Sequence, residues 1–147
     1  MGNLTEEFLR GEEGLNSFPL FVYGTLRPGG SNHFLVEPFI DGLDDGLYVK
    51  GRLFSSALGL YPVLVGGLDD KSNRVVGSLL TLRLDSRLIS NILFEEVLYG
   101  YDLRCVDVFR RDDDSLHRRA LVCYYNSDVF LDTYIPSGDW LMYLESD

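Results

Sequence analysis

Histidine and cysteine are scarce in this chain of 147 residues, which contains two of each. Neither His33 nor His117 has the spacing of a metal-ligand pair, so a metal site is not expected. Cys105 and Cys123 lie in separate apolar segments without a CxxC motif, and we expect buried free thiols in a reducing cytoplasm. With so little histidine, any acid–base chemistry falls to a carboxylate or a tyrosine.

Long apolar runs and basic residues are lacking as well. No stretch of about 18 apolar residues exists, so no transmembrane helix is expected, and the acidic N-terminus has no apolar segment typical of a secretory signal. Lys and Arg number 13 against 23 Asp and Glu, a net charge of −10, which disfavours nucleic acid and membrane surfaces as partners. We expect a cytoplasmic protein with a polar N-terminal leader at 1–18 and a single domain at 19–147.

Short segments rich in β-forming residues make up most of the domain. Strands are expected at 19–24, 47–54, 59–65, 74–82, 101–109 and 118–125, with a hairpin turn at 110–115. Residues 36–47 are expected to form a connection, and Ser31 to cap a short helix. At 84–97 the apolar period becomes helical, with Asp85 as a natural N-cap. This order predicts an α+β fold, a small mixed, mostly antiparallel β-barrel with one main helix inserted.

The most distinctive stretch is residues 20–30, LFVYGTLRPGG. A strand that we expect to be buried on both faces stops at Gly24, and the Pro-Gly-Gly that follows prevents a regular element from continuing. The backbone N–H groups of Gly24, Thr25 and Leu26 have no obvious partner in a sheet, and such a row of donors can receive a carboxylate or a polarised carbonyl. A tight turn at the edge of the core explains the same pattern, so both interpretations stay open.

Glu95 and Glu96 lie at the C-terminal end of the expected helix. The partial negative charge of a helix C-terminus disfavours an ionised carboxylate, and burial beside Phe94 acts in the same direction. A glutamate whose pKa is raised in this way is a candidate general base. Neighbouring helical residues point about 100° apart, so at most one of the two faces a pocket. The alternative interpretation is that both are solvent-facing charges on a polar helix face.

Several short motifs, taken in order, resemble the gamma-glutamylcyclotransferase-like family, which includes AIG2-like, BtrG-like and YtfP-like branches. The segment VYGTLR at 22–27 resembles its opening strand and loop, and FEEV at 94–97 its helix-end glutamate motif. The strand motifs GRLF, YP and VG and the terminal SGDW follow the same order, so the resemblance runs from about residue 19 to 141. The chain departs from the family pattern at Glu96, Ser78 and Leu103, where glycine, glutamate and arginine are usual, and Arg104 lies one residue beyond the last position.

This resemblance implies an enzyme that needs no cofactor and no metal. The family converts a gamma-glutamyl amino acid or gamma-glutamylamine into 5-oxoproline and a free amine. The implied general base is Glu95, and Glu96 is the reserve candidate if the helix is rotated by one residue. The implied substrate-binding residues are Tyr23, Gly24, Thr25 and Leu26, with backbone N–H groups that hold the glutamyl part. The alternative is a non-catalytic family member that binds a small acidic metabolite or a protein partner.

Overall fold

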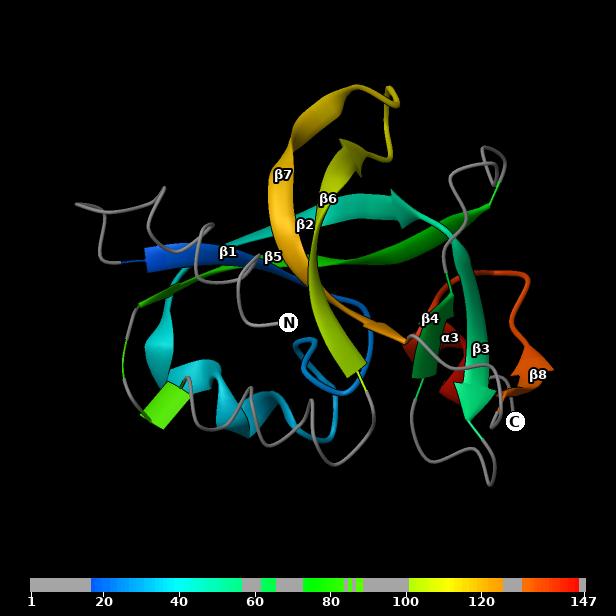
Figure 1. Ribbon diagram of the computed structural model, residues 1–147, viewed down its shortest axis with the longest axis horizontal. Helices are drawn as coiled ribbons and strands as arrows, with labels where there is room; N and C mark the ends of the chain where they lie inside the picture. The colour runs from blue at the N-terminus through cyan, green and yellow to red at the C-terminus, as the bar shows by residue number, and fades with distance from the viewer. Residues whose placement is uncertain are drawn as a thin grey trace.

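The computed structural model describes residues 17–56, 62–65, 73–83, 85, 87–88, 101–125 and 131–145. Five strands form a closed barrel (Figure 1), and their order around it is β1 (Ser17–Val22), β5 (Arg74–Arg83), β2 (Ile40–Lys50), β6 (Tyr101–Arg110) and β7 (Leu116–Tyr125). Neighbouring strands run antiparallel except β1 and β7, whose parallel pairing closes the ring. The predicted mixed, mostly antiparallel barrel is confirmed.

A second, three-stranded antiparallel sheet lies beside the barrel, on the right in Figure 1, in the order β4 (Pro62–Val65), β3 (Arg52–Ser56) and β8 (Leu131–Tyr134). The chain passes from β2 into β3 at Gly51, whose φ of 152° and N–H bond to the Asn73 carbonyl mark a sharp change of direction. The single strand predicted at 47–54 is therefore wrong. Its two halves belong to different sheets.

Strand β1 is buried on both faces, as its sequence predicts. Consecutive side chains of a strand point to opposite faces, and here Phe21 joins one apolar cluster while Leu20 and Val22 join another. Each is at most 3% exposed, and burying a side chain of this size contributes about 1.5–3 kcal/mol to stability. The strand ends at Val22 rather than at residue 24, so the loop that follows starts from a rigid base.

The region predicted as a connection at 36–47 contains the start of β2, so that prediction is wrong. Strand β2 begins at Ile40 and accommodates its acidic, glycine-containing stretch through a register shift between Asp44 and Leu47. Gly46, in the left-handed region with φ of 73°, supplies the turn that this shift requires. A bulge thus allows a sequence with weak strand propensity to remain paired with β5.

Short helical elements flank the barrel. Two 3₁₀ helices, η1 (His33–Leu35) and η2 (Glu37–Phe39), follow the loop, and a short helix, α3 (Trp140–Glu145), follows β8. The N-cap of η1 is Asn32, so the predicted cap at Ser31 is wrong. Neither β8 nor α3 was expected, because the four residues of β8 and the six of α3 are too short for their periodicity to stand out.

The expected main helix is only partly described. Arg87 and Leu88 are helical, and the Asp85 carboxylate accepts the Arg87 N–H at 2.8 Å, as an N-cap does. Glu95 and Glu96, with the rest of that segment, lie outside the described residues, as do residues 1–16. In the part of the chain that is described, no helix has the length and apolar character needed to cross a membrane.

Candidate functional site

The candidate site is the loop that leaves the end of β1. Tyr23, the first residue after the strand, is 4% exposed and belongs to the same apolar cluster as Trp140 and Leu53. The start of the loop therefore belongs to a core cluster that also contains residues of the small sheet and of the C-terminal segment. The structure therefore places Tyr23, one of the implied substrate-binding residues, in the core, and its position fixes where the next three residues begin.

The loop folds back on itself through its carbonyl groups. Arg27 N–H donates to the Gly24 carbonyl at 3.0 Å, and Asn32 N–H donates to the Thr25 carbonyl at 2.8 Å. The Asn32 amide also donates to the Thr25 hydroxyl at 3.2 Å, and a ring nitrogen of His33 lies 2.8 Å from the Leu26 carbonyl. Sequence reasoning missed Asn32 and His33 as residues that hold the loop, although both follow it within ten residues.

The backbone N–H groups of residues 24–26 differ from their carbonyl groups. Among the described residues, the backbone N–H groups of Gly24, Thr25 and Leu26 donate no hydrogen bond, while their carbonyls are all occupied. Strand β1 has already ended at Val22, so no sheet ladder reaches these donors. An oriented set of unused N–H groups suits an anionic or carbonyl ligand.

Gly24 is required by close packing against the small sheet. A Cβ at this position would collide with the ring of Pro62 at the start of β4. Gly30 has a similar constraint, because a Cβ there would collide with the Thr25 carbonyl. The two glycines thus allow a compact loop that lies directly on β4. The sequence alone does not show whether a glycine is needed for such close packing or for the approach of a ligand.

An ion pair joins the loop to the C-terminal turn. Arg27 Nη1 lies 2.9 Å from Asp139 Oδ1, and the two side chains are only 14% and 20% exposed. Asp139 belongs to the SGDW motif, 112 residues away in sequence. Two motifs of the resemblance, one near each end of the domain, therefore meet at the candidate site.

Two of the positions where the chain departs from the family pattern are also visible. Ser78 pairs with Val22 in the sheet, is 1% exposed, and donates its hydroxyl proton to the Asp45 carboxylate. Leu103 lies on β6 opposite Cys123. Arg104, the next residue of the strand, is exposed.

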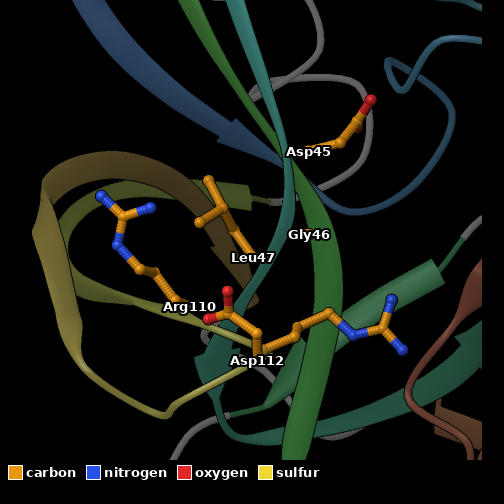
Figure 2. Close-up of a pocket in the computed structure, with 6 residues that line it drawn as sticks. Asp45, Gly46, Leu47, Arg110 and Asp112 are labelled. Carbon is orange, nitrogen blue, oxygen red and sulfur yellow. The ribbon is translucent and has the colours of Figure 1, made fainter.

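A shallow cavity of about 380 Å³ lies elsewhere, between the β2 bulge and the turn that joins β6 to β7. Its lining residues are Asp45, Gly46, Leu47, Arg110, Arg111 and Asp112. Figure 2 shows the side chains of Asp45 and Arg110 pointing away from each other, so these charges do not converge on one ligand. None of the predicted site residues lines this cavity.

Asp113 and Cys105 are two titratable residues away from the loop whose pKa shifts are explained by local structure. Asp113 accepts hydrogen bonds from the Ser115 N–H and hydroxyl, which lower the pKa of its carboxyl, in agreement with a solvated hairpin turn. Burial raises the pKa of the Cys105 thiol, and the nearby Arg119 only partly offsets this, so it is a poor nucleophile. In the described ranges no cluster of three His, Cys, Asp or Glu side chains is arranged to hold a metal ion.

The sequence matches one family model, described as gamma-glutamyl cyclotransferase, AIG2-like, over residues 20–142. No curated protein matches the chain. The matched range starts inside β1 and ends inside α3, so it includes the loop, the barrel and the SGDW turn.

Solved structures with the same fold include YkqA from Bacillus subtilis, with 29% identity and a TM-score of 0.65 over 89% of this chain. The chain spans only 43% of YkqA. An uncharacterized protein, PH0828, from Pyrococcus horikoshii has 23% identity and a TM-score of 0.58, with coverage of 88% of this chain and 96% of that one. An AIG2-like protein from Mus musculus has 20% identity and a TM-score of 0.55, with coverage of 85% and 95%. At these identities the last two likenesses show the fold alone.

Proposed function

This chain belongs to the gamma-glutamyl cyclotransferase, AIG2-like family, and we propose that it is a cyclotransferase acting on a small gamma-glutamyl compound. The substrate is a gamma-glutamyl amino acid or a gamma-glutamylamine, and the products are 5-oxoproline and a free amine. In the reaction, the α-nitrogen of the glutamyl group bonds to its own γ-carbonyl carbon, and the bond from that carbon to the leaving nitrogen breaks. Neither water nor a cofactor is consumed.

The observation that carries the proposal is the set of unused donors on the loop. In the described part of the chain, the N–H groups of Gly24, Thr25 and Leu26 have no acceptors, and these residues follow a strand buried on both faces. These donors hold the glutamyl part of the substrate by hydrogen bonds. Because these donors are already held in place, little conformational entropy is lost when the substrate binds. Fixed donors can also hold the glutamyl group in the bent conformation that ring closure requires.

Glu95 is the proposed general base. It takes a proton from the α-ammonium group, which frees the amine to attack, and it returns that proton to the departing nitrogen. The ring nitrogen loses a second proton as the ring closes. Glu95, again a carboxylate, accepts this proton and passes it to the free amine, which leaves as an ammonium ion. Both protons lost by the α-nitrogen are thus accounted for, and one carboxyl group serves both transfers. Because ring closure is intramolecular, orientation supplies a large part of the rate.

The test is the release of 5-oxoproline from a panel of gamma-glutamyl amino acids and gamma-glutamylamines. Wild type is compared with Glu95→Gln, and Glu96→Gln is the matched control because it makes the same change one residue along. Product from wild type and Glu96→Gln but not from Glu95→Gln supports the proposal and assigns the base. Full activity of Glu95→Gln would remove this residue from the mechanism.

The alternative function is that of a family member that binds its ligand without turnover. The observation that favours it is Ser78. The family pattern has a glutamate where this serine lies buried and bonded to Asp45. A binder would give no 5-oxoproline from any panel member, and calorimetry would still detect binding of a gamma-glutamyl compound. Turnover of any panel member rules this alternative out.

A further inference from the structure

We propose that the Arg27–Asp139 ion pair positions the 24–26 loop, so that the C-terminal turn holds the three N–H donors in place. The effect on substrate rests on the cyclotransferase proposal, whereas the effect on the loop does not. Arg27 is thus a positioning residue that acts through the backbone of its neighbours. The interaction is the 2.9 Å contact between Arg27 Nη1 and Asp139 Oδ1.

The Asp139 end of the pair is rigidly held on the barrel. Gly138, with φ of 66°, accepts a hydrogen bond from Val76 N–H at 2.7 Å, and a Cβ there would collide with the Arg74 carbonyl. The next residue, Trp140, is buried in the core. The turn that carries Asp139 therefore lies directly against β5 and cannot shift without disturbing that strand.

The carboxylate of Asp139 has a second partner that fixes its orientation. Asp139 Oδ1 accepts the Met142 N–H at 3.2 Å, and Tyr143 N–H donates to the Asp139 carbonyl at 2.9 Å. The residue thus caps the start of α3 while it holds Arg27. Asp139 is therefore held by contacts that do not involve Arg27, which is what an anchor requires.

The Arg27 end lies in the middle of the loop. Its own N–H donates to the Gly24 carbonyl, and its carbonyl accepts Gly30 N–H at 2.7 Å. A displacement of Arg27 is therefore transmitted to Gly24 and its neighbours through one hydrogen bond. In the part of the chain that the structure describes, the Arg27 side chain forms the ion pair that connects the loop to the C-terminal segment.

Among the described residues, the Arg27 guanidinium has no other acceptor that could replace Asp139. Its Nε is buried and has no hydrogen-bond partner in the part of the chain that the structure describes. A largely buried cation that loses its carboxylate carries a desolvation cost that is only partly offset by water, so the loop moves to restore solvation. Loss of Asp139 should therefore displace the loop rather than leave it unchanged.

A second arginine–aspartate pair provides a matched control. Arg83 and Asp41 are 3.0 Å apart, but their side chains are 51% and 46% exposed and lie in β5 and β2, away from the loop. Exposed pairs of this kind contribute little because water solvates both partners after the pair is broken. Arg83→Met thus removes the same chemical groups without touching the proposed device.

Hydrogen exchange of the loop amides tests the proposal directly. The reporters are the N–H groups of residues 27, 30 and 32, all bonded within the loop. We expect Arg27→Met to accelerate their exchange about tenfold, less than for a completely buried pair because both partners are partly exposed. We expect Arg83→Met to match wild type. Equal exchange in Arg27→Met and Arg83→Met would overturn the proposal.

Two further variants keep the test decisive if Arg27→Met fails to fold. Arg27→Lys should restore wild-type exchange, since the contact uses a single nitrogen and an ammonium group can replace it. Asp139→Asn retains the cap of α3, because asparagine caps helices as well as aspartate does, but it removes the charge. Its loop amides should exchange faster, and wild-type exchange in this variant would overturn the proposal.

Kinetics separate positioning from simple stabilisation. If wild type releases 5-oxoproline, Arg27→Met should raise KM about tenfold and keep most of kcat, because the loop binds substrate and transition state alike. A lower melting temperature with an unchanged KM would show a purely structural pair and overturn the proposal. If wild type releases no product, the cyclotransferase proposal fails while the exchange experiment still decides the role of the ion pair.

Discussion

Tyr48 of β2 donates its phenolic proton to the carboxylate of Asp114 at 3.0 Å, which ties the turn between β6 and β7 to the barrel. Arg74 of β5 reaches the same carboxylate at 2.9 Å and lies over the Tyr48 ring, 4.6 Å from its centroid. Asp114 has a φ of 61°, which is uncommon for a residue other than glycine. Strands β2 and β5 thus meet the β6–β7 turn at Asp114, which this network holds in its uncommon conformation.

Removing the Tyr48 hydroxyl should weaken the turn. We expect Tyr48→Phe to lower the free energy of unfolding by about 1 kcal/mol, the usual net value of one hydrogen bond, because Asp114 keeps its contact with Arg74. Tyr134→Phe is the control, since its hydroxyl bonds to Asn73 on the exposed surface and should cost less. Urea unfolding of the three proteins measures the difference. An equal loss in both variants would show that burial of Tyr48 is unimportant here.

The same tyrosine should make stability depend on alkaline pH. Burial and the bond to Asp114 raise the pKa of Tyr48 above its usual value of 10.0, with Arg74 opposing the shift. The folded state therefore holds this proton more tightly than the unfolded chain, so its contribution is complete below about pH 10 and is lost as the pH rises through the folded pKa. We expect the urea midpoint of wild type to fall more steeply above pH 10 than that of Tyr48→Phe. Parallel curves would contradict this.

Gly24→Ala should damage both stability and binding. Its Cβ would collide with the ring of Pro62, and accommodating such an extra group in a packed site costs about 1–3 kcal/mol. Gly42→Ala is the matched control, because a Cβ at Gly42 meets Thr81 at an ordinary distance of 3.5 Å. Thermal unfolding and the KM for the best panel substrate are the measurements. If Gly24→Ala behaves like Gly42→Ala, the loop does not depend on its contact with β4.

Glu95→Gln should lower kcat and leave KM nearly unchanged. The amide keeps the shape of the side chain but cannot accept the proton, and general-base catalysis typically contributes about 10²- to 10⁴-fold. Arg27→Met, in contrast, is expected to act on KM. Steady-state kinetics of the two variants on one substrate therefore distinguish the proton-transfer role from the positioning role. A rise in KM without loss of kcat in Glu95→Gln would assign it to binding instead.

The sequence predicted well those elements whose signals are local. The buried strand around Phe21, the long strand β5 and the hairpin turn at 110–115 all follow from apolar runs bounded by turn residues, and all three are confirmed. The predictions failed where a local signal was misleading. Gly51 divides one apparent strand between two sheets, and the bulge before Leu47 keeps an acidic segment paired.

For the candidate site, the sequence indicated the loop but not what holds it. Thr25 and its neighbours were singled out for their unused N–H groups, which the described residues leave without acceptors. The contacts with Pro62 and Asp139 could not be predicted, because each joins segments far apart in the chain. Glu95 as general base stays a prediction, since it lies outside the described residues.

The sequence by itself determined the family, the strand-rich composition of the barrel and the place of the loop, because motifs, apolar periodicity and glycine positions are local properties of the chain. Only the tertiary structure decided that β1 closes the ring through a parallel pairing with β7, and that Arg27 reaches Asp139 across 112 residues. Such contacts depend on how the elements pack around a shared core, and no local pattern carries that information.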